Sequence, residues 1–266
     1  MDTTLRAPGY RFALFDFDGT LSLIRAGWVK VMVPMAVEFL SQTATAESEA
    51  ELTAVADDFV ARLTGKQTIY QMLELARQIE LRGGRPKEPL WYKREYLHRL
   101  QARIAHRITA LETGTATPEN YLVPGSRALL DRLRARGLKM YLASGTDDPL
   151  VRREAELLGL TQYFDGGIFG ALDDYKSFSK RILIERILST TGIGGTSLLG
   201  FGDGYVEIRN VKQVGGFAVG LATDEPECLR VDEWKRKRLE GVGADMIIPN
   251  YLPVAGLEDA LFGSDQ

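Results

Sequence analysis

The chain has 266 residues, which suits one large α/β unit or a core with an added smaller domain. Its 33 lysine and arginine residues nearly balance 36 aspartate and glutamate residues, so the net charge of −3 offers no dominant basic field for nucleic acid. The single cysteine, Cys228, excludes an internal disulfide and a zinc–thiolate cluster, and two histidines are too few for a histidine-rich site. Any metal should therefore be bound through oxygen.

The N-terminal residues Met1 to Pro8 are polar and contain no apolar segment of signal-peptide length. No later run approaches the roughly 18 apolar residues that a membrane span needs. We therefore expect a soluble, cytoplasmic protein that does not engage a membrane.

Residues 12–21 (FALFDFDGTL) combine an apolar run with an acidic, glycine-containing turn. The run favours a central parallel strand, and ligands bind beyond the carboxyl ends of such strands. Side chains two apart in an extended chain point the same way, so Asp16 and Asp18 should share one site. Gly19 allows a ligand to approach the main chain, and Thr20 offers a hydroxyl and an amide to an anion.

Two carboxylates this close need a compensating charge. At about 4 Å and an effective dielectric near 20 they repel by roughly 4 kcal/mol. Mg²⁺ is commonly held by one or two carboxylates together with substrate phosphate and water, so it is the natural counter-ion. The alternative is an ordinary strand-end turn in which aspartate and glycine only end the strand.

A helical region follows this turn. Apolar residues recur every three or four positions, and the spacing predicts helices over residues 25–41, 52–63, 68–81 and about 89–111. Pro34 should kink or break the first helix. About 100 residues inserted here would lie over the mouth of the site, so we expect an all-helical cap domain over residues 23–117. The catalytic core would comprise residues 1–22 and 118–266.

From Pro124 onward the pattern alternates between helix and strand, which is typical of βαβ units in an α/β fold. Strands are expected over residues 138–143, near 168–169, and over 197–201, 217–219 and 246–248. The helices between them should cover residues 125–136, 149–158 and 178–189. Polar turns with glycine end three strands of this core, at residues 16–19, 144–146 and 202–204.

The order of these turns resembles the haloacid dehalogenase superfamily, and within it the phosphoglycolate phosphatase-like hydrolases with a helical cap after the first motif. The resemblance rests on Asp16-Phe17-Asp18-Gly19-Thr20, on Ser144 after a strand, on a following lysine and on Gly202-Asp203-Gly204-Tyr205-Val206-Glu207. It spans almost the whole core. It implies a doubly wound, Rossmann-like parallel sheet and Mg²⁺-dependent phosphoryl transfer through an aspartyl-phosphate.

In this family pattern Asp16 is the nucleophile, and Asp18 is the general acid that later activates water. Asp18 must be protonated when substrate arrives, so its pKa should be raised, and its backbone carbonyl binds the metal. Ser144, Gly145 and Thr146 would hold phosphoryl oxygens. Outside this context the same three residues would be interpreted as a common structural turn.

A lysine should neutralise the nucleophile and the transferred phosphoryl group. Lys176 fits the family spacing ahead of the apolar pair at 182–183, whereas Lys180 is expected on the first turn of the next helix, in solvent. Asp16, Asp18 and Asp203 would be metal ligands, with Glu207 as a supporting carboxylate. The family more often has aspartate at that last position, so direct, water-mediated and indirect roles stay open for Glu207.

Substrate choice should depend on the cap. Arg25 and Lys66 are candidate substrate-binding residues, and the alternative is that they are exposed residues at helix ends. The basic run over residues 235–238 is interpreted as a solvated helix face.

The sequence therefore predicts a Mg²⁺-dependent phosphatase that hydrolyses a small soluble phosphate monoester, such as a phosphoglycolate-like acid or a sugar phosphate. One alternative is a phosphomutase of the β-phosphoglucomutase type, and another is a non-catalytic phosphate-binding regulatory protein. The expected partner is a small phosphorylated metabolite rather than nucleic acid, and the expected assembly is a monomer or a homodimer.

Overall fold

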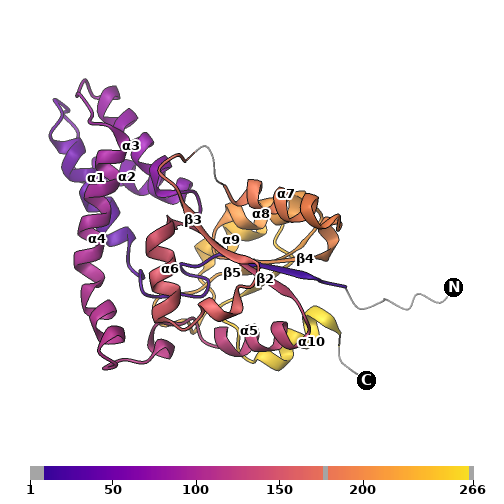
Figure 1. Cartoon of the computed structure of the whole chain (residues 1–266). Coiled ribbons are helices and arrows are strands. Elements are labelled where there is room, and N and C mark those ends of the chain that lie inside the picture. Colours follow the sequence, from indigo (N-terminus) through magenta and orange to yellow (C-terminus); the bar gives the residue numbers. More distant parts are fainter. Residues whose placement is uncertain (1–8, 176–178, 264–266) are drawn as a thin grey trace.

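The computed structural model describes residues 9–175 and 179–263, which form a six-stranded parallel sheet with helices on both faces (Figure 1). The sheet order is β3-β2-β1-β4-β5-β6. This order is that of a doubly wound, Rossmann-like fold, as predicted. The strands are β1 (Phe12–Phe15), β2 (Lys139–Asp147), β3 (Gly167–Ala171), β4 (Leu198–Gly202), β5 (Phe217–Leu221) and β6 (Met246–Ile248).

Strand β1 lies at the centre of the sheet and is buried along its whole length. It pairs in parallel with β2 and β4, with Phe12 opposite Lys139 and Leu198. Its side chains alternate between the two faces, as the pleat requires. Phe12 and Leu14 pack with α7 (Lys180–Thr191), α8 (Tyr205–Gln213) and α9 (Glu233–Glu240). Ala13 and Phe15 pack with α5 (Ser126–Ala135), α6 (Asp148–Leu157) and α10 (Val254–Phe262).

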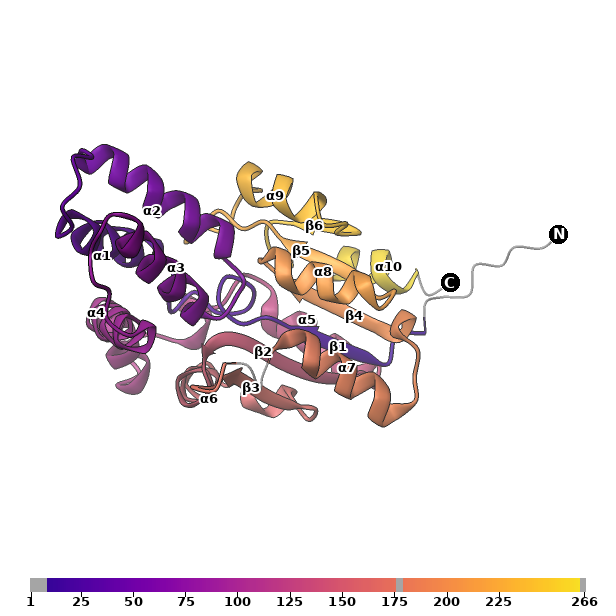
Figure 2. The ribbon, with the colours of Figure 1, turned by 90° about the horizontal axis from the view of Figure 1, so that it is seen from above.

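Four helices between β1 and β2 form what we call the helical insert: α1 (Val29–Ser41), α2 (Glu49–Leu63), α3 (Thr68–Leu81) and α4 (Pro89–Glu112). They gather at one end of the sheet, beyond the carboxyl end of β1 (Figure 2). A capping box of Ser48 and Glu51 begins α2, and Pro89 lies in the first turn of α4. The buried side chains of the insert are continuous with the core on the α5, α6 and α10 side of the sheet.

The chain leaves the core and returns to it at one point. Ser22 forms an antiparallel bridge with Leu122. The Leu23 amide donates to the Tyr121 carbonyl at 2.8 Å, and the Val123 amide donates to the Leu21 carbonyl at 3.0 Å. The chain therefore enters and leaves the helical insert through two adjacent, hydrogen-bonded segments.

Pro34 was expected to kink or break the first helix, and it does not break it. Helix α1 runs through it from Val29 to Ser41. Pro34 removes one intrahelical hydrogen bond, but Met32, Met35 and Leu40 bury the same helix against the rest of the insert, and such packing provides most helical stability in proteins.

Two elements of the core differ from the expectation. Strand β2 does not end at Ala143 but continues to Asp147, and its pairing with β3 becomes irregular between these two residues. The turn expected at residues 144–146 is therefore an irregular stretch inside a strand. The short helices α8 and α10 were not predicted.

Three single-turn 3₁₀ helices complete the described chain, at Pro118–Tyr121, Thr161–Tyr163 and Gly195–Ser197. None of the helices in residues 9–175 and 179–263 combines the length and the apolar character that a membrane-spanning segment requires.

Candidate active site

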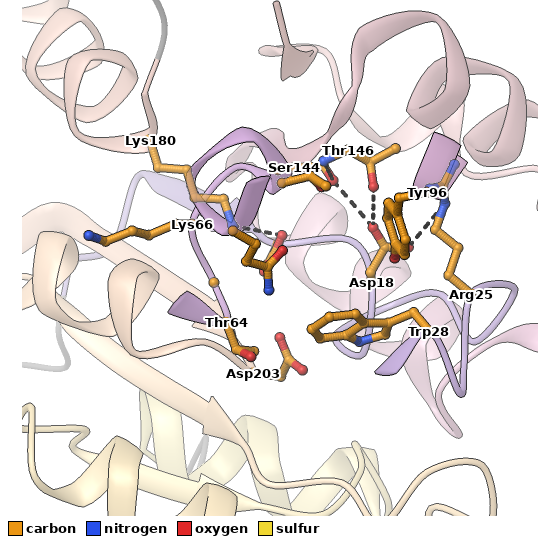
Figure 3. A pocket seen from close by; sticks show the side chains of 15 residues that line it. Asp18, Arg25, Trp28, Thr64, Lys66, Tyr96, Ser144, Thr146, Lys180 and Asp203 are labelled. Atoms are coloured by element: carbon orange, nitrogen blue, oxygen red, sulfur yellow. Dashed lines mark hydrogen bonds and ion pairs between the residues drawn. The ribbon is translucent and has the colours of Figure 1, made fainter. Parts of the chain in front are cut away.

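A pocket opens at the carboxyl ends of β1, β2 and β4, with the helical insert forming its opposite wall (Figure 3). It holds about 640 Å³ of space, including the solvent at its mouth. The core lines it with Asp16, Asp18, Ser144, Gly145, Thr146, Lys180 and Asp203, and the insert with the segment leading into it contributes Arg25, Trp28, Thr64, Gly65, Lys66, Thr68, Gln71 and Tyr96. Residues from three separate motifs of the sequence therefore meet in one place.

Asp16 follows β1 directly, and its amide donates to the Phe201 carbonyl at 2.9 Å, which extends the sheet pairing to this residue. Its Oδ1 accepts from the Phe17 amide at 2.8 Å. The ammonium of Lys180 lies 2.8 Å from the same oxygen. Asp16 is thus fixed at the strand end and paired with a cation.

Lys180 is buried, with 7% of its side chain exposed, so the expectation that it is solvated is wrong. It occupies the first turn of α7, as expected, because the Ser179 side chain accepts from the Ile182 amide and begins the helix there. From that position it points into the pocket (Figure 3). Lys176, the lysine predicted to be catalytic, lies outside the described residues.

Glu207 lies behind Lys180 and forms an ion pair with it through Oε1. Its other oxygen, Oε2, is buried without a hydrogen-bond partner in the described part of the chain. A Cβ on Gly202 would lie 2.8 Å from the Glu207 Cβ, so glycine at this strand end makes room for the carboxylate. The structure therefore places Glu207, predicted near the metal, as the second partner of the lysine.

Asp18 is held by two hydroxyls of β2. Thr146 Oγ1 donates to its Oδ2 at 2.8 Å, and Ser144 Oγ lies 3.4 Å from the same atom. Its Oδ1 has no hydrogen-bond partner within residues 9–175 and 179–263. Burial raises the pKa of Asp18 to about 7, although Arg25 opposes the rise. This carboxyl group is therefore a proton donor and acceptor near neutral pH.

Arg25 lies near Asp18, but its main ion pair is with Glu154. Its Nε is 3.8 Å from Asp18 Oδ1, whereas Nε and Nη2 bind Glu154 in a bidentate pair at 3.0 and 2.7 Å. Arg25 and Glu154 are both buried. The pair leaves the guanidinium at the edge of the pocket, with its charge largely balanced, and Tyr96 of α4 lies beside it (Figure 3).

Asp203 follows β4, and its amide donates to Thr20 Oγ1 at 3.0 Å. Thr20, predicted to bind an anion, is fully buried and instead ties the two acidic turns together. Lys235 of α9 lies 3.2 Å from Asp203 Oδ2 and 2.6 Å from Glu225 Oε1. The expectation of a fully solvated basic run is therefore wrong at Lys235. Burial raises the pKa of Asp203 to about 6; Lys235 lowers it, and Asp16 and Glu225 raise it.

The loop between α2 and α3 brings the helical insert against the core. Gly65 approaches Gly204 so closely that a Cβ on Gly204 would lie 2.9 Å from the Gly65 Cα. The Lys66 carbonyl would lie 3.1 Å from a Cβ on Gly145. The ammonium of Lys66 points away from Asp18 and lies over the Tyr70 ring at 5.4 Å (Figure 3). The main chain of this loop, more than its lysine, closes the pocket.

Within the described ranges, no three acidic, histidine or cysteine side chains converge closely enough to hold a metal ion by themselves. Asp16 and Asp203 nevertheless both line the pocket, and Asp16 is close enough to raise the pKa of Asp203. These two carboxylates are the groups that could hold a hard cation.

Sequence reasoning missed several residues of this site. Glu154 carried a signal, because it lies beside Val151 and Ala155 on the buried face of α6, where a carboxylate needs a partner. Lys235 carried a similar signal, since Leu239 lies one turn further along α9 and is buried. Tyr96, Thr64, Thr68 and Gln71 lie at ordinary helix or loop positions, and nothing in their spacing indicated a pocket.

The sheet order, the insert after β1 and the pocket at the strand ends define a doubly wound α/β protein with acidic side chains at the carboxyl ends of its central strands. A model of the haloacid dehalogenase-like hydrolases matches residues 10–215. The chain therefore belongs to the haloacid dehalogenase-like hydrolase family. No curated protein sequence matches it.

Solved structures share this fold over nearly their full length. A predicted phosphoglycolate phosphatase from Haemophilus somnus 129PT has 14% identity and a TM-score of 0.57, with 94% of this chain and 98% of that one aligned. A phosphonoacetaldehyde hydrolase-like protein from Oleispira antarctica has 14% identity and a TM-score of 0.61, with 98% and 96% aligned. A β-phosphoglucomutase from Clostridium difficile has 15% identity and a TM-score of 0.57, with 95% and 97% aligned.

Proposed function

We propose that the protein is a Mg²⁺-dependent phosphatase that hydrolyses a small phosphate monoester through an aspartyl-phosphate on Asp16. The observation that carries the proposal is the pairing of Asp16 with Lys180 at 2.8 Å, beside Asp18 with its pKa near 7. A nucleophile, a cation for the transferred group and a proton donor are thus in one pocket.

In the first step a carboxylate oxygen of Asp16 attacks phosphorus as the bond from phosphorus to the ester oxygen breaks. Both described partners of Asp16 bind Oδ1, so we assign the attack to Oδ2. Asp18 in its protonated form gives its proton to the leaving ester oxygen. Lys180 balances negative charge on the nucleophile and on the phosphoryl oxygens.

In the second step Asp18, now ionised, takes a proton from water as that water attacks the phosphorus of the aspartyl-phosphate. Phosphate leaves, and Asp16 returns as a carboxylate. Ser144 and Thr146 hold Asp18 in place throughout, since both hydroxyls lie on its Oδ2. One residue can serve both steps because its pKa is raised to about 7, so that it both gives and takes a proton near neutral pH.

The residues present fit the oxygen chemistry of a magnesium ion. Asp16 and Asp203 would hold it, together with the backbone carbonyl of Asp18, because Mg²⁺ usually binds one or two carboxylates plus substrate phosphate and water. When bound, the ion supplies positive charge that offsets the excess of buried carboxylates and of phosphate oxygens.

We propose further that the helical insert acts as a cap that selects a small, polar leaving group. Its wall of the pocket includes the polar side chains of Thr64, Thr68 and Gln71 and the rings of Trp28 and Tyr96. Lys66 also lines the pocket, but its ammonium lies over the Tyr70 ring and points away from Asp18 (Figure 3). Arg25 is neutralised by Glu154, so it serves an acidic leaving group less well than a free guanidinium would. This composition favours a hydroxylated ester such as a sugar phosphate.

The test is phosphate release from a panel of sugar phosphates and small acid phosphates, with Mg²⁺ or with EDTA. Asp16→Asn and Asp18→Asn are measured beside the unaltered protein, and circular dichroism checks their folding. The proposal requires release that depends on the metal and on Asp16. Acid-quenched protein should also carry labelled phosphate on Asp16.

Isomerisation of a sugar phosphate without net phosphate release would overturn the phosphatase in favour of a phosphomutase. That outcome has a structural precedent in the similar fold of the Clostridium difficile β-phosphoglucomutase. If the folded protein shows no phosphate release and no isomerisation, both activities are rejected, and a phosphate-binding regulatory protein is favoured.

A further inference from the structure

Lys235 lies behind the pocket, where it joins two carboxylates from different loops. Its Nζ is 3.2 Å from Asp203 Oδ2 and 2.6 Å from Glu225 Oε1. Asp203 lines the pocket, whereas Lys235 and Glu225 do not. The exposed fractions of the three side chains are between 15% and 17%, so the cluster is largely withdrawn from water.

The backbone around this cluster holds the lysine in place. Asp232 begins α9 and accepts from the amides of Trp234 and Lys235 at 2.9 Å. The segment before it is closed by a bridge between Thr223 and Val231. Further along α9, Arg238 donates to the Ala61 carbonyl of the helical insert.

Gly19 of the first acidic turn lies directly against the carboxylates of Asp203 and Glu225. A Cβ on Gly19 would lie 2.9 Å from Glu225 Oε1 and would overlap Asp203 Oδ2. The ammonium therefore binds Asp203 within a few ångströms of the turn that carries Asp16 and Asp18. A positive charge at this point acts directly on any cation that shares Asp203.

We propose that Lys235 is a built-in counter-cation of Asp203 that competes with the divalent metal and so sets the metal affinity of the site. This inference rests on the proposed function only in assigning Asp203 to the metal. With no metal bound, the ammonium neutralises Asp203. When a metal binds, Glu225 retains the lysine, and Asp203 is released to the new cation.

The inference predicts opposite changes in metal affinity for substitutions at Lys235 and at Glu225. Removing the ammonium, as in Lys235→Met, removes a repulsive charge and a competing partner, so the metal should bind about tenfold tighter or more. Removing the charge of Glu225, as in Glu225→Gln, leaves Asp203 as the remaining carboxylate of Lys235. The metal should then bind about tenfold more weakly.

The experiment is a titration of the full-length protein with Mn²⁺ alone, with free Mn²⁺ measured by electron paramagnetic resonance and no substrate present. Lys237→Met is the matched control, because Lys237 lies on the same helix, is exposed and is not in the pocket lining. Its Kd should stay within about twofold of the unaltered protein, since exposed charges at a distance are screened.

If Lys235→Met binds Mn²⁺ with an unchanged or higher Kd, the inference is overturned. If Lys235→Met does not fold, Glu225→Gln decides alone, and an unchanged Kd there overturns it. The double variant Lys235→Met/Glu225→Gln separates competition from a direct metal contact of Glu225. Competition requires that Glu225→Gln lose most of its effect once Lys235 is absent, whereas an undiminished effect contradicts it.

Absence of Mn²⁺ binding by both the unaltered protein and Lys235→Met would overturn the inference as well. The proposed hydrolysis is judged separately, by phosphate release in the presence of Mg²⁺ and by its loss in Asp16→Asn. The two ideas can therefore fail independently.

Discussion

The ammonium of Lys180 lies 2.8 Å from Oδ1 of Asp16 and also pairs with Glu207, so a single buried lysine links the end of β1 to the first turn of α8. In the proposed reaction the lysine would have two functions, because it pairs with Asp16, the proposed nucleophile, and also holds the carboxylate of Glu207 on α8. It also makes Lys180, rather than Lys176, the lysine on which phosphoryl transfer should depend.

Lys180→Met should lower kcat by about 10²- to 10³-fold, the usual loss when a charge-stabilising group is removed from an active site. Lys176→Met is the comparison and should retain activity within about threefold, since Lys180 already supplies the cation. Steady-state phosphate release measures both. A large loss in Lys176→Met with an active Lys180→Met would reverse the assignment.

Asp18 should make the protein less stable as the pH rises. Its pKa is near 7 in the folded protein, against 3.8 for a free aspartate, so between these values the folded state holds a proton that the unfolded chain has released. The stabilisation from neutral Asp18 is complete below about pH 4 and is lost by about pH 7. Asp18→Asn cannot ionise and escapes this loss.

From pH 5 to pH 8 the free energy of unfolding of Asp18→Asn, relative to the unaltered protein, should rise by about 3 kcal/mol. Urea unfolding in EDTA at the two pH values measures this change. Asp57→Asn removes an exposed carboxylate of α2 and should show a smaller change. A constant difference for Asp18→Asn would show that Asp18 titrates normally.

Gly65→Ala should impair the site through contact rather than through folding. Gly65 has φ +91°, and a Cβ there would meet the Gly204 Cα at 3.2 Å. Gly114 has a comparable φ of +69° but open space around it, so Gly114→Ala is the matched control. Both variants should lose about 1 kcal/mol of stability from the left-handed backbone.

Only Gly65→Ala should lower kcat/KM, by about 10- to 100-fold, because the loop between α2 and α3 can no longer seat against the core. Steady-state kinetics and thermal unfolding of both variants separate the two effects. Equal kcat/KM values for the two variants would mean that this contact does not shape the pocket.

The buried pair of Arg25 and Glu154 should show strong coupling. Glu154→Ala leaves a buried guanidinium without its main partner and should cost about 3 kcal/mol or more of unfolding free energy. Arg25→Met should cost a similar amount. The double variant Arg25→Met/Glu154→Ala should be clearly more stable than the sum of the single losses predicts. Additive losses in urea unfolding would argue against a functional pair.

The sheet and the pocket aspartates could be predicted from sequence because their signals are local. An apolar run ending in Asp16 and Asp18 marks both the strand and its exit, and Asp203 follows the same rule after β4. The lysine could not be assigned, because Lys176 and Lys180 follow the same acidic turn and only the start of α7 at Ser179 directs Lys180 inward.

Long-range pairing explains the remaining differences. The basic run on α9 has the composition of a solvated surface, yet the turn that leads into it places Lys235 against Asp203, 32 residues away in sequence. Thr20 likewise follows an acidic, glycine-containing turn and was expected to bind an anion, but its hydroxyl accepts from the Asp203 amide and holds that second turn. Such roles depend on which loops meet in space, and the sequence pattern does not contain that information.

The paired segments at Ser22 and Leu122 have a consequence for how this chain acquires its fold. Strand β1 emerges first from the ribosome, but its partners β2 and β4 are synthesised only after the whole insert. This fully buried strand must therefore wait unpaired while four helices form. The pairing of the segments around Ser22 and Leu122 closes the insert at its two ends and brings β1 beside β2 as soon as β2 has been synthesised. This reduces the entropy cost of closing the long loop between the two strands. The order of synthesis, and not only the final contacts, thus favours an insert whose two ends meet.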